Sequence, residues 1–182
     1  VTLGAGNVAL NTTGTATGSV AVTGSGNATR TVTISSITGD GTLGISIAAG
    51  TASDAAGNLA AAEGPSTAFS VDNTAPSVSI GAPSATITNG ASVTYTVSYV
   101  GASSVTLNAG DVTLNSSGTA TGTVGVTGSG TATRTVTVSS ITGNGTLGIS
   151  IAANTATDAA GNIAPSAGPG ATFTVDTDAP TI

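Results

Sequence analysis

The stretch Ala91-Ser-Val-Thr-Tyr-Thr-Val-Ser-Tyr-Val100 alternates apolar and polar side chains. Val93, Tyr95, Val97 and Tyr99 stand at every second position, so an extended chain places them on one face, with Ser and Thr on the other. A period of two with many β-branched side chains is typical of a half-buried β-strand. The stretch therefore predicts a strand over 91–100 whose Val and Tyr face belongs to a hydrophobic core.

Shorter segments with the same character lie on both sides of this strand. Pro83 interrupts the first of them, which fits an edge strand because proline cannot donate to a ladder. Gly143-Asn-Gly is a tight-turn signal, and no segment has the 3.6-residue period of a capped helix. Several short strands with regularly spaced turns predict an all-β sandwich. The further strands are expected at 77–80, 85–88, 105–107, 112–114, 119–127, 131–141, 147–151 and 171–175.

The chain repeats itself. Val1-Thr-Leu-Gly-Ala-Gly-Asn-Val recurs as Val105-Thr-Leu-Asn-Ala-Gly-Asp-Val, an offset of 104 residues that holds without a gap to the end. A period of this length fits one sandwich domain of about 100 residues. We expect an incomplete repeat over 1–76, whose N-terminal strands are missing or supplied from elsewhere, and a complete repeat over 77–182 that includes the start of the next linker.

Composition narrows the chemistry. Hydrophobic residues make up 38% of the chain but aromatic ones only 2%, so the core is expected to consist of Val, Ile, Leu and Ala. The chain has no Cys, His, Met, Trp or Lys, which removes the usual nucleophile–base pairs and His-ligated metals. With a net charge of −6 and only two cationic residues, the chain lacks the positive charges that bind phosphate groups and anionic membrane surfaces. We expect no enzyme, no nucleic-acid binding and no membrane insertion.

Two motifs carry a family resemblance. Asp158-Ala-Ala-Gly-Asn-Ile-Ala precedes Phe173-Thr-Val-Asp-Thr-Asp-Ala-Pro, and both recur in the first copy from Asp54 and Phe69. These motifs resemble tandem bacterial immunoglobulin-like repeats, which occur in very long surface adhesins and other large secreted proteins. The resemblance implies tandem Greek-key sandwiches, an extracellular location on the bacterial surface, and a role as a spacer.

The Asp-Ala-Ala-Gly-Asn motif has two interpretations. In the first, Asp54 or Asp158 caps backbone amides, glycine takes a positive φ, and Asn58 or Asn162 closes a structural turn. In the second, the Asp and Asn oxygens are calcium ligands, because hard cations prefer oxygen. Calcium takes 6–8 oxygen ligands, so backbone carbonyls and water would complete the set.

The domain-end segments Val71-Asp-Asn-Thr-Ala-Pro and Val175-Asp-Thr-Asp-Ala-Pro bear on the same question. They are superficially similar to the calcium-stiffened linkers of cadherins. Calcium would then join Asp72 and Asn73 to Asp158 and Asn162, and Asp176 and Asp178 would serve the next junction. The simpler interpretation is that Asp and Pro end a strand and set a rigid turn.

Two further repeat positions have structural interpretations. Asp40 aligns with Asn144, a replacement that suits a turn better than an essential charge. Arg30 aligns with Arg134 on a predicted strand, and we expect both on a solvated face or in a local ion pair.

Three roles follow. The first is a non-catalytic extender or fibre module of a long extracellular bacterial surface or filament protein, whose partners are neighbouring repeats of the same or an identical chain. The second is a filament subunit completed by strand addition from a neighbouring chain. The third is a carbohydrate or host-ligand binding adhesin module, which the few aromatic residues disfavour. Calcium is the only cofactor expected under any of them.

Overall fold

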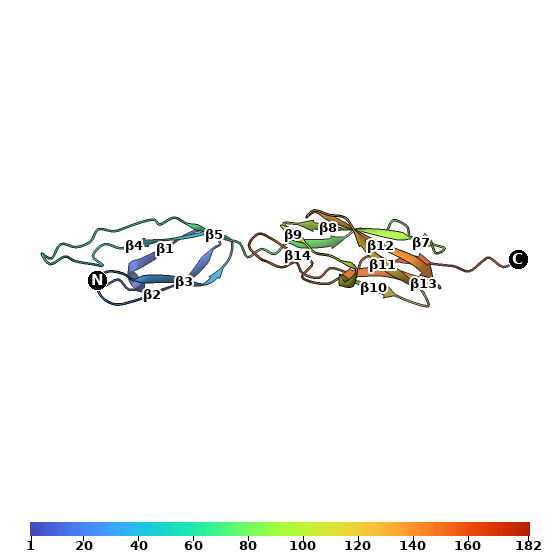
Figure 1. The fold of residues 1–182 in the computed structure, drawn as a ribbon, viewed down its shortest axis with the longest axis horizontal. Helices are drawn as coiled ribbons and strands as arrows, with labels where there is room; N and C mark the ends of the chain where they lie inside the picture. Colours follow the sequence, from blue (N-terminus) through green and yellow to red (C-terminus); the bar gives the residue numbers. More distant parts are fainter. The chain divides into compact units, whose positions relative to one another are not determined.

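The computed structural model describes residues 1–182, which divide into two compact units: Val1–Thr74, called unit 1, and Ala75–Ile182, called unit 2 (Figure 1). Both units are built from strands. Two three-residue 3-10 turns, η1 (Ala5–Asn7) and η2 (Ala109–Asp111), are the sole helical elements. The all-β prediction is therefore confirmed. No helix in the chain has the length and apolar character that a membrane crossing requires.

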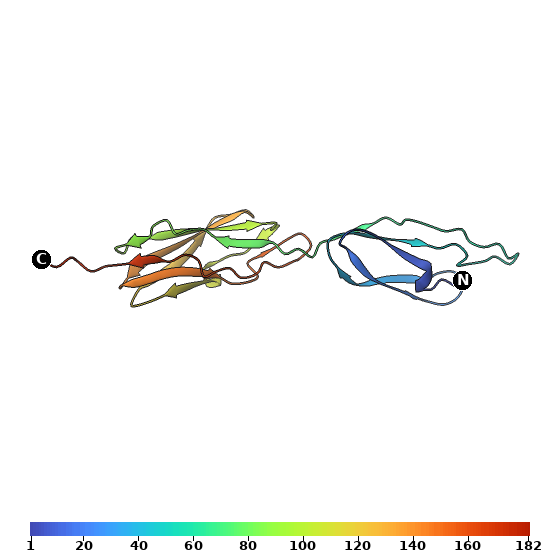
Figure 2. The same ribbon diagram turned by 180° about the vertical axis from the view of Figure 1, so that it is seen from behind.

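Unit 2 contains two four-stranded sheets, which Figure 2 shows from behind. Every pairing in them is antiparallel except that of β15 with β7, which is parallel. A two-stranded pair, β9 (Ser104–Val105) with β14 (Ala156–Thr157), lies outside the two sheets. In order, the first sheet is β11 (Thr121–Thr127), β12 (Thr133–Thr142), β8 (Val93–Val100) and β6 (Ser77–Ile80), and the second is β10 (Val112–Ser116), β13 (Gly145–Ile151), β15 (Phe173–Val175) and β7 (Ile87–Thr88).

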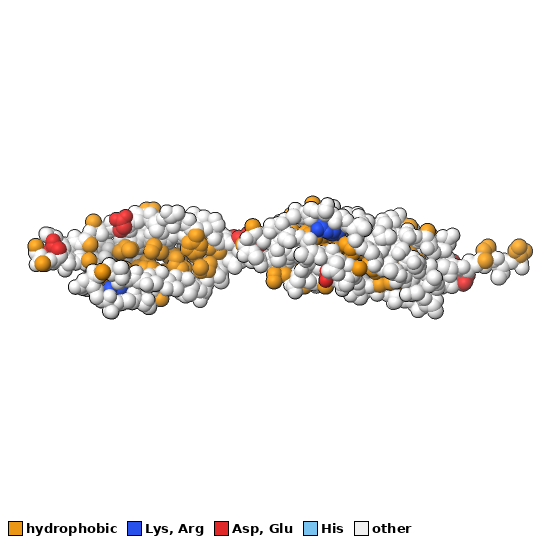
Figure 3. Space-filling view, in the orientation of Figure 1, with side chains coloured by type: hydrophobic (Ala, Val, Ile, Leu, Met, Phe, Trp, Pro, Cys, Tyr) orange, Lys and Arg blue, Asp and Glu red, His pale blue; other side chains and the backbone are white.

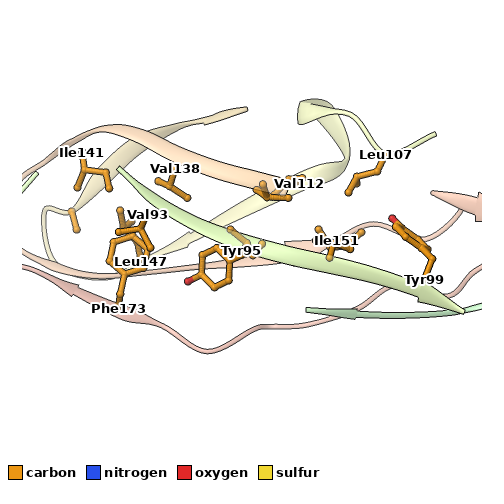
Figure 4. Packing of buried hydrophobic residues seen from close by; sticks show 14 of the residues in the cluster. Val93, Tyr95, Tyr99, Leu107, Val112, Val138, Ile141, Leu147, Ile151 and Phe173 are labelled. Atoms are coloured by element: carbon orange, nitrogen blue, oxygen red, sulfur yellow. The ribbon is translucent and has the colours of Figure 1, made fainter. Parts of the chain in front are cut away.

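Strand β8 supplies the centre of the unit 2 core. Its burial alternates as predicted, and Val93, Tyr95, Val97 and Tyr99 are all buried. The Tyr95 ring lies against Phe173 of the opposite sheet, with 6.3 Å between ring centroids (Figure 4). Both tyrosine hydroxyls are satisfied, because Tyr95 donates to the Ala171 carbonyl at 2.8 Å and Tyr99 donates to Thr155 Oγ1 at 2.9 Å. Aromatic rings thus bridge the two layers of a core that is otherwise mostly aliphatic.

Unit 1 repeats five of these strands. It has one three-stranded and one two-stranded sheet, and each strand aligns with a unit 2 strand at the 104-residue offset. The register repeats as well, since Val8 pairs with Ile47 as Val112 pairs with Ile151. Unit 1 has no counterpart of β6, β7 or β8. Its sheets have the orders β1 (Val8–Gly14), β4 (Gly41–Ile47), β5 (Phe69–Val71) and β2 (Thr17–Thr23), β3 (Thr31–Thr38).

The predicted Gly-Asn-Gly turn joins β12 to β13, which belong to different sheets. Gly143 adopts φ 77°, and a Cβ there would lie 2.1 Å from the Thr119 carbonyl oxygen. Gly39 in unit 1 has the same geometry, with φ 75° and the same 2.1 Å approach to Thr15. Only glycine fits at this crossing, which explains why the turn is preserved in both copies.

Candidate functional site

The Asp158 motif forms a closed turn. Asp158 Oδ1 accepts hydrogen bonds from the backbone N–H groups of Ala160 and Asn162, both at 2.9 Å, and Oδ2 accepts from Asn162 Nδ2 at 2.8 Å. Gly161 takes φ 93°, as the structural-turn interpretation requires. The hydrogen bond from the Asn162 side chain is the largest influence that lowers the pKa of Asp158, followed by bonds from backbone N–H groups. The carboxylate therefore serves as the organising acceptor of its own loop.

Unit 1 repeats this turn in detail. Asp54 Oδ1 accepts from the backbone of Ala56 and Asn58 at 2.9 Å, and Oδ2 accepts from Asn58 Nδ2 at 2.9 Å. The Asn58 side chain is again the main cause of a lowered pKa at Asp54. The structure thus brings together Asp54 with Asn58 and Asp158 with Asn162, as both interpretations of the motif require.

The segment that leaves unit 1 is held against the turn between β3 and β4. Asp72 Oδ1 accepts from the Thr74 backbone N–H at 3.0 Å, which bends the segment after β5. Asp40 Oδ1 then accepts from the Asn73 backbone N–H at 2.6 Å, and Asp40 Oδ2 accepts from Thr74 Oγ1 at 2.8 Å. Asn73 Nδ2 donates to the Gly39 carbonyl at 2.6 Å. We call this set of contacts the exit latch of unit 1.

Unit 2 has the equivalent exit latch with an amide in place of the carboxylate. Asn144 Oδ1 accepts from the Thr177 backbone N–H at 2.7 Å, and Thr177 Oγ1 lies 3.2 Å from the Gly143 carbonyl. Asp176 Oδ1 accepts from the Asp178 backbone N–H at 3.1 Å, which repeats the bend. The backbone contact is therefore retained although the acceptor has changed from Asp to Asn.

Of the two turn residues that accept from the exit segments, only Asp40 of unit 1 is ionisable, because unit 2 has Asn144 in its place. The Asn73 backbone N–H, followed by the Thr74 hydroxyl, lowers the pKa of Asp40 from its usual value. Asn144 has no corresponding titration. The sequence placed Asp40 and Asn144 in turns but did not reveal what they hold, because their partners lie 33 residues further along the chain.

Within either unit, the predicted ligand residues do not fit a calcium site. Asp54 and Asp158 already accept several hydrogen bonds inside their own loops, and each loop contributes one carboxylate. Asp72 and Asp176 bend their exit segments. The chain has no group of three or more Asp, Glu, His or Cys side chains that could hold a metal ion. A calcium ion that joins neighbouring domains remains a prediction.

Arg134 departs from its predicted place. The expectation of a solvated face or an ion pair was wrong, because Arg134 is only 8% exposed. It donates to the backbone carbonyls of Gly130, Thr133 and Val105, at 2.8, 2.9 and 2.9 Å. Its strand position faces inward beside Val97, where backbone oxygens rather than carboxylates are within reach. The guanidinium therefore ties β9 to the loop between β11 and β12.

Arg30 makes a smaller version of this contact. Its guanidinium donates to the carbonyls of Thr29 and Val1, both at 2.9 Å, and the side chain is half-buried. The two cationic residues are thus structural ties at one repeat position.

No protein-family model, curated protein or solved structure matches the chain.

Proposed function

We propose that the chain is a non-catalytic extender module of a long extracellular bacterial surface or filament protein, built from immunoglobulin-like sandwiches. The observation that carries this proposal is the exit latch, which recurs at the same repeat position in both units. A spacer requires each domain to pass the chain onward in a defined direction relative to its own body. The latch supplies this by binding the exit segment to a turn of the same unit.

The strand order of unit 2 supports the immunoglobulin-like part of the proposal. Constant-type immunoglobulin domains have sheets in the order ABED and CFG. With β6 as strand A, the two sheets of unit 2 follow this order: β6, β8, β12 and β11 in one, and β10, β13 and β15 in the other. Strand β7 follows β6 in the chain but pairs with β15, so it belongs to the second sheet. This strand order supports a Greek-key connectivity.

The pairing of β15 with β7 suits a domain that carries load. The Thr174 N–H donates to the Thr86 carbonyl at 2.9 Å, and the Asp176 N–H donates to the Thr88 carbonyl at 3.0 Å. The strands are parallel and belong to the two ends of the unit. Force applied between those ends makes the strands slide past each other, so the hydrogen bonds are loaded together rather than opened one after another.

Single-molecule force measurements on the chain, tethered at its two ends, test the proposal. We expect unit 2 to resist and then unfold in one step that releases on the order of 300 Å of chain. Asp176→Pro removes the N–H that bonds to Thr88 and should lower the unfolding force. Asp176→Ala retains that N–H and serves as the matched control. A unit 2 that extends without measurable resistance would contradict the proposal.

Filament assembly by strand addition is the second candidate, and one observation favours it. Phe69 of unit 1 is 44% exposed, although its counterpart Phe173 is buried. A fibre role for either candidate implies neighbouring repeats of the same or an identical chain as partners. The carbohydrate-binding role has no comparable support, since Tyr95, Tyr99 and Phe173 all lie in the core of unit 2.

A further inference from the structure

Strand β11 forms a free edge of unit 2. It pairs with β12 on one side and with no strand on the other. At seven residues it is the longest of the four edge strands of the unit, since β6, β10 and β7 have four, five and two. Unit 2 contains both four-stranded sheets in full, so β11 is an edge of a complete sandwich.

The hydrogen-bond ladder shows which backbone groups of β11 are unpaired. The Tyr99 N–H donates to the Ala132 carbonyl at 2.8 Å, so even-numbered residues of the β12 segment bond towards β8 and odd-numbered ones bond towards β11. Gly125 lies opposite one of these odd-numbered residues and bonds to it. Val124 and Val126, on either side of Gly125, therefore direct their N–H and C=O groups away from the sheet. These four groups form an open row along the edge.

Strand β11 also lacks the features that usually protect such an edge. Proteins prevent edge-to-edge pairing with short strands, charged side chains and proline. The opposite edge of this sheet has two of these, because β6 is short and Pro83 follows it. The sequence of β11, Thr-Gly-Thr-Val-Gly-Val-Thr, contains neither proline nor a charge. Figure 3 shows how few charged side chains lie on the visible surface of either unit.

The sequence of β11 reads the same in both directions around Gly125. Val124 and Val126 flank the glycine, and Thr123 and Thr127 flank the valines. If two copies of β11 pair antiparallel about a two-fold axis at Gly125, each valine lies opposite the other valine and each threonine opposite the other threonine. The valines then exchange backbone hydrogen bonds, so all four open groups of each strand are satisfied. Their half-buried side chains are covered further in the same contact.

We propose that β11 is a docking edge for a second copy of this chain, whose own β11 pairs with it in this two-fold register. The two four-stranded sheets then join into one continuous sheet. The inference goes beyond the extender role and does not rest on it, because it concerns contacts between molecules that lie side by side. Strand β2 of unit 1 has the near-symmetric sequence Ser19-Val-Ala-Val-Thr23 at the same repeat position. In a protein with many such repeats, weak edge contacts would add along its length.

Single cysteines can map this contact, because the chain has none of its own. Non-hydrogen-bonded partners in an antiparallel pair lie about 4.5 Å apart between Cα atoms, a separation that a disulfide can span. The full chain with Gly125→Cys, incubated with oxidised glutathione, should therefore form linked dimers about tenfold or more faster than the chain with Thr96→Cys. Thr96 is the matched control, because it is exposed on the same face of the sheet but lies on the inner strand β8.

A mixing experiment tests the register. The proposed pairing places Thr123 of one copy opposite Thr127 of the other, whereas like positions lie roughly 13 Å apart. A mixture of the Thr123→Cys and Thr127→Cys chains should therefore form mixed dimers, and each chain alone should form few.

Amide hydrogen exchange tests the edge without a disulfide. The Val124 and Val126 amides should exchange more slowly as the concentration of the full chain rises. Gly125→Lys places a charge at the centre of the edge and should abolish this dependence, whereas Thr96→Lys, with the same change in net charge, should retain it. A Cβ at Gly125 meets no atom within 4 Å, so the lysine can be accommodated. Tyrosine fluorescence in urea checks that unit 2 stays folded, since both tyrosines lie in it.

The proposal is overturned if Gly125→Cys links no faster than Thr96→Cys, or if Thr123→Cys links to itself as readily as to Thr127→Cys. It is also overturned if the chain associates while exchange at Val124 and Val126 stays independent of concentration, because another surface would then form the contact. A monomeric disulfide in a chain with both Ala21→Cys and Gly125→Cys would instead make β2 of the same chain the partner. None of these outcomes bears on the force resistance of unit 2, so the extender role is tested separately.

Discussion

Unit 1 and unit 2 have nearly the same sequence at their aligned positions but bury it to different extents. Leu43 and Leu147 are both fully buried, because each lies between strands that both units possess. Phe69 and Phe173 differ, because only unit 2 has the β8 strand that covers the ring. The comparison shows that the same side chain at the same repeat position does not contribute equally to the folding free energy of the two units. The partner strand determines whether the side chain contributes to a core.

The largest expected effect comes from truncating the two phenylalanines that share this repeat position. Phe173→Ala should lower the free energy of unfolding of unit 2 by about 3–5 kcal/mol, whereas Phe69→Ala should cost unit 1 about 1 kcal/mol or less. Both tyrosines lie in unit 2, so tyrosine fluorescence in a urea titration reports that unit alone. Amide exchange in β4 reports unit 1. Equal losses in the two units would show that β8 does not set the difference.

Substitution of the two arginines that share a repeat position should give a smaller difference in unfolding free energy between the units. Arg134→Met keeps an apolar stem but leaves the carbonyls of Gly130 and Val105 without their donor, which should cost unit 2 about 1.5–3 kcal/mol. Arg30→Met should cost unit 1 less, because Arg30 is half-buried and its acceptors can reach water. Tyrosine fluorescence in a urea titration measures the loss in unit 2, and amide exchange in β4 measures the loss in unit 1. A loss at Arg30 as large as that at Arg134 would contradict the role of burial.

The exit latches should differ in their response to acid. The pKa of Asp40 is lowered in the folded chain, so its contribution to stability is present above the unfolded pKa and is lost as the pH falls through the lower folded value. The Asn73 amide resonance should therefore follow the titration of its acceptor Asp40, below the usual pKa of 3.8, whereas the Thr177 N–H has Asn144 Oδ1 as its acceptor, which does not titrate. Nuclear magnetic resonance titration checks this.

Exchanging the two latch residues provides the control. Asp40→Asn should remove the titration from the Asn73 amide while keeping its hydrogen bond, and Asn144→Asp should introduce a titration at Thr177. If neither exchange alters the pH profile, the latch residues do not hold the exit segments in solution.

Calcium gives the smallest expected effect. Because the Asp and Asn residues of each turn bond to one another, the structural-turn interpretation predicts the same melting temperature in calcium and in a chelator. If ions join the domains, binding linkage would raise the melting temperature by several degrees. A rise of that size would restore the calcium interpretation of Asp72, Asn73, Asp158 and Asn162.

Much of the fold could be predicted from local patterns. The alternation of Val93 to Tyr99 specifies both a strand and its buried face, and this was confirmed. The two-residue strand β14 was not expected, because its pairing with β9 depends on a long-range contact rather than on a pattern of its own. The burial of Arg134 escaped prediction for the same reason, since its acceptors come from three separate positions. The Asp158 turn was foreseen because all its partners lie within a few residues.

The near-identity of β3 and β12 also has a consequence for folding kinetics. During folding, β8 has two almost equivalent acceptor strands in the same chain. Its native acceptor, β12, is the nearer one, and β3 is roughly one and a half times as far along the sequence. Each doubling of a loop costs only about 0.6 kcal/mol in closure entropy, so proximity gives the correct pairing a small advantage. The repetition that lengthens the protein therefore also creates a competing misfolded topology, which refolding at high denaturant dilution should reveal as a slow phase in tyrosine fluorescence.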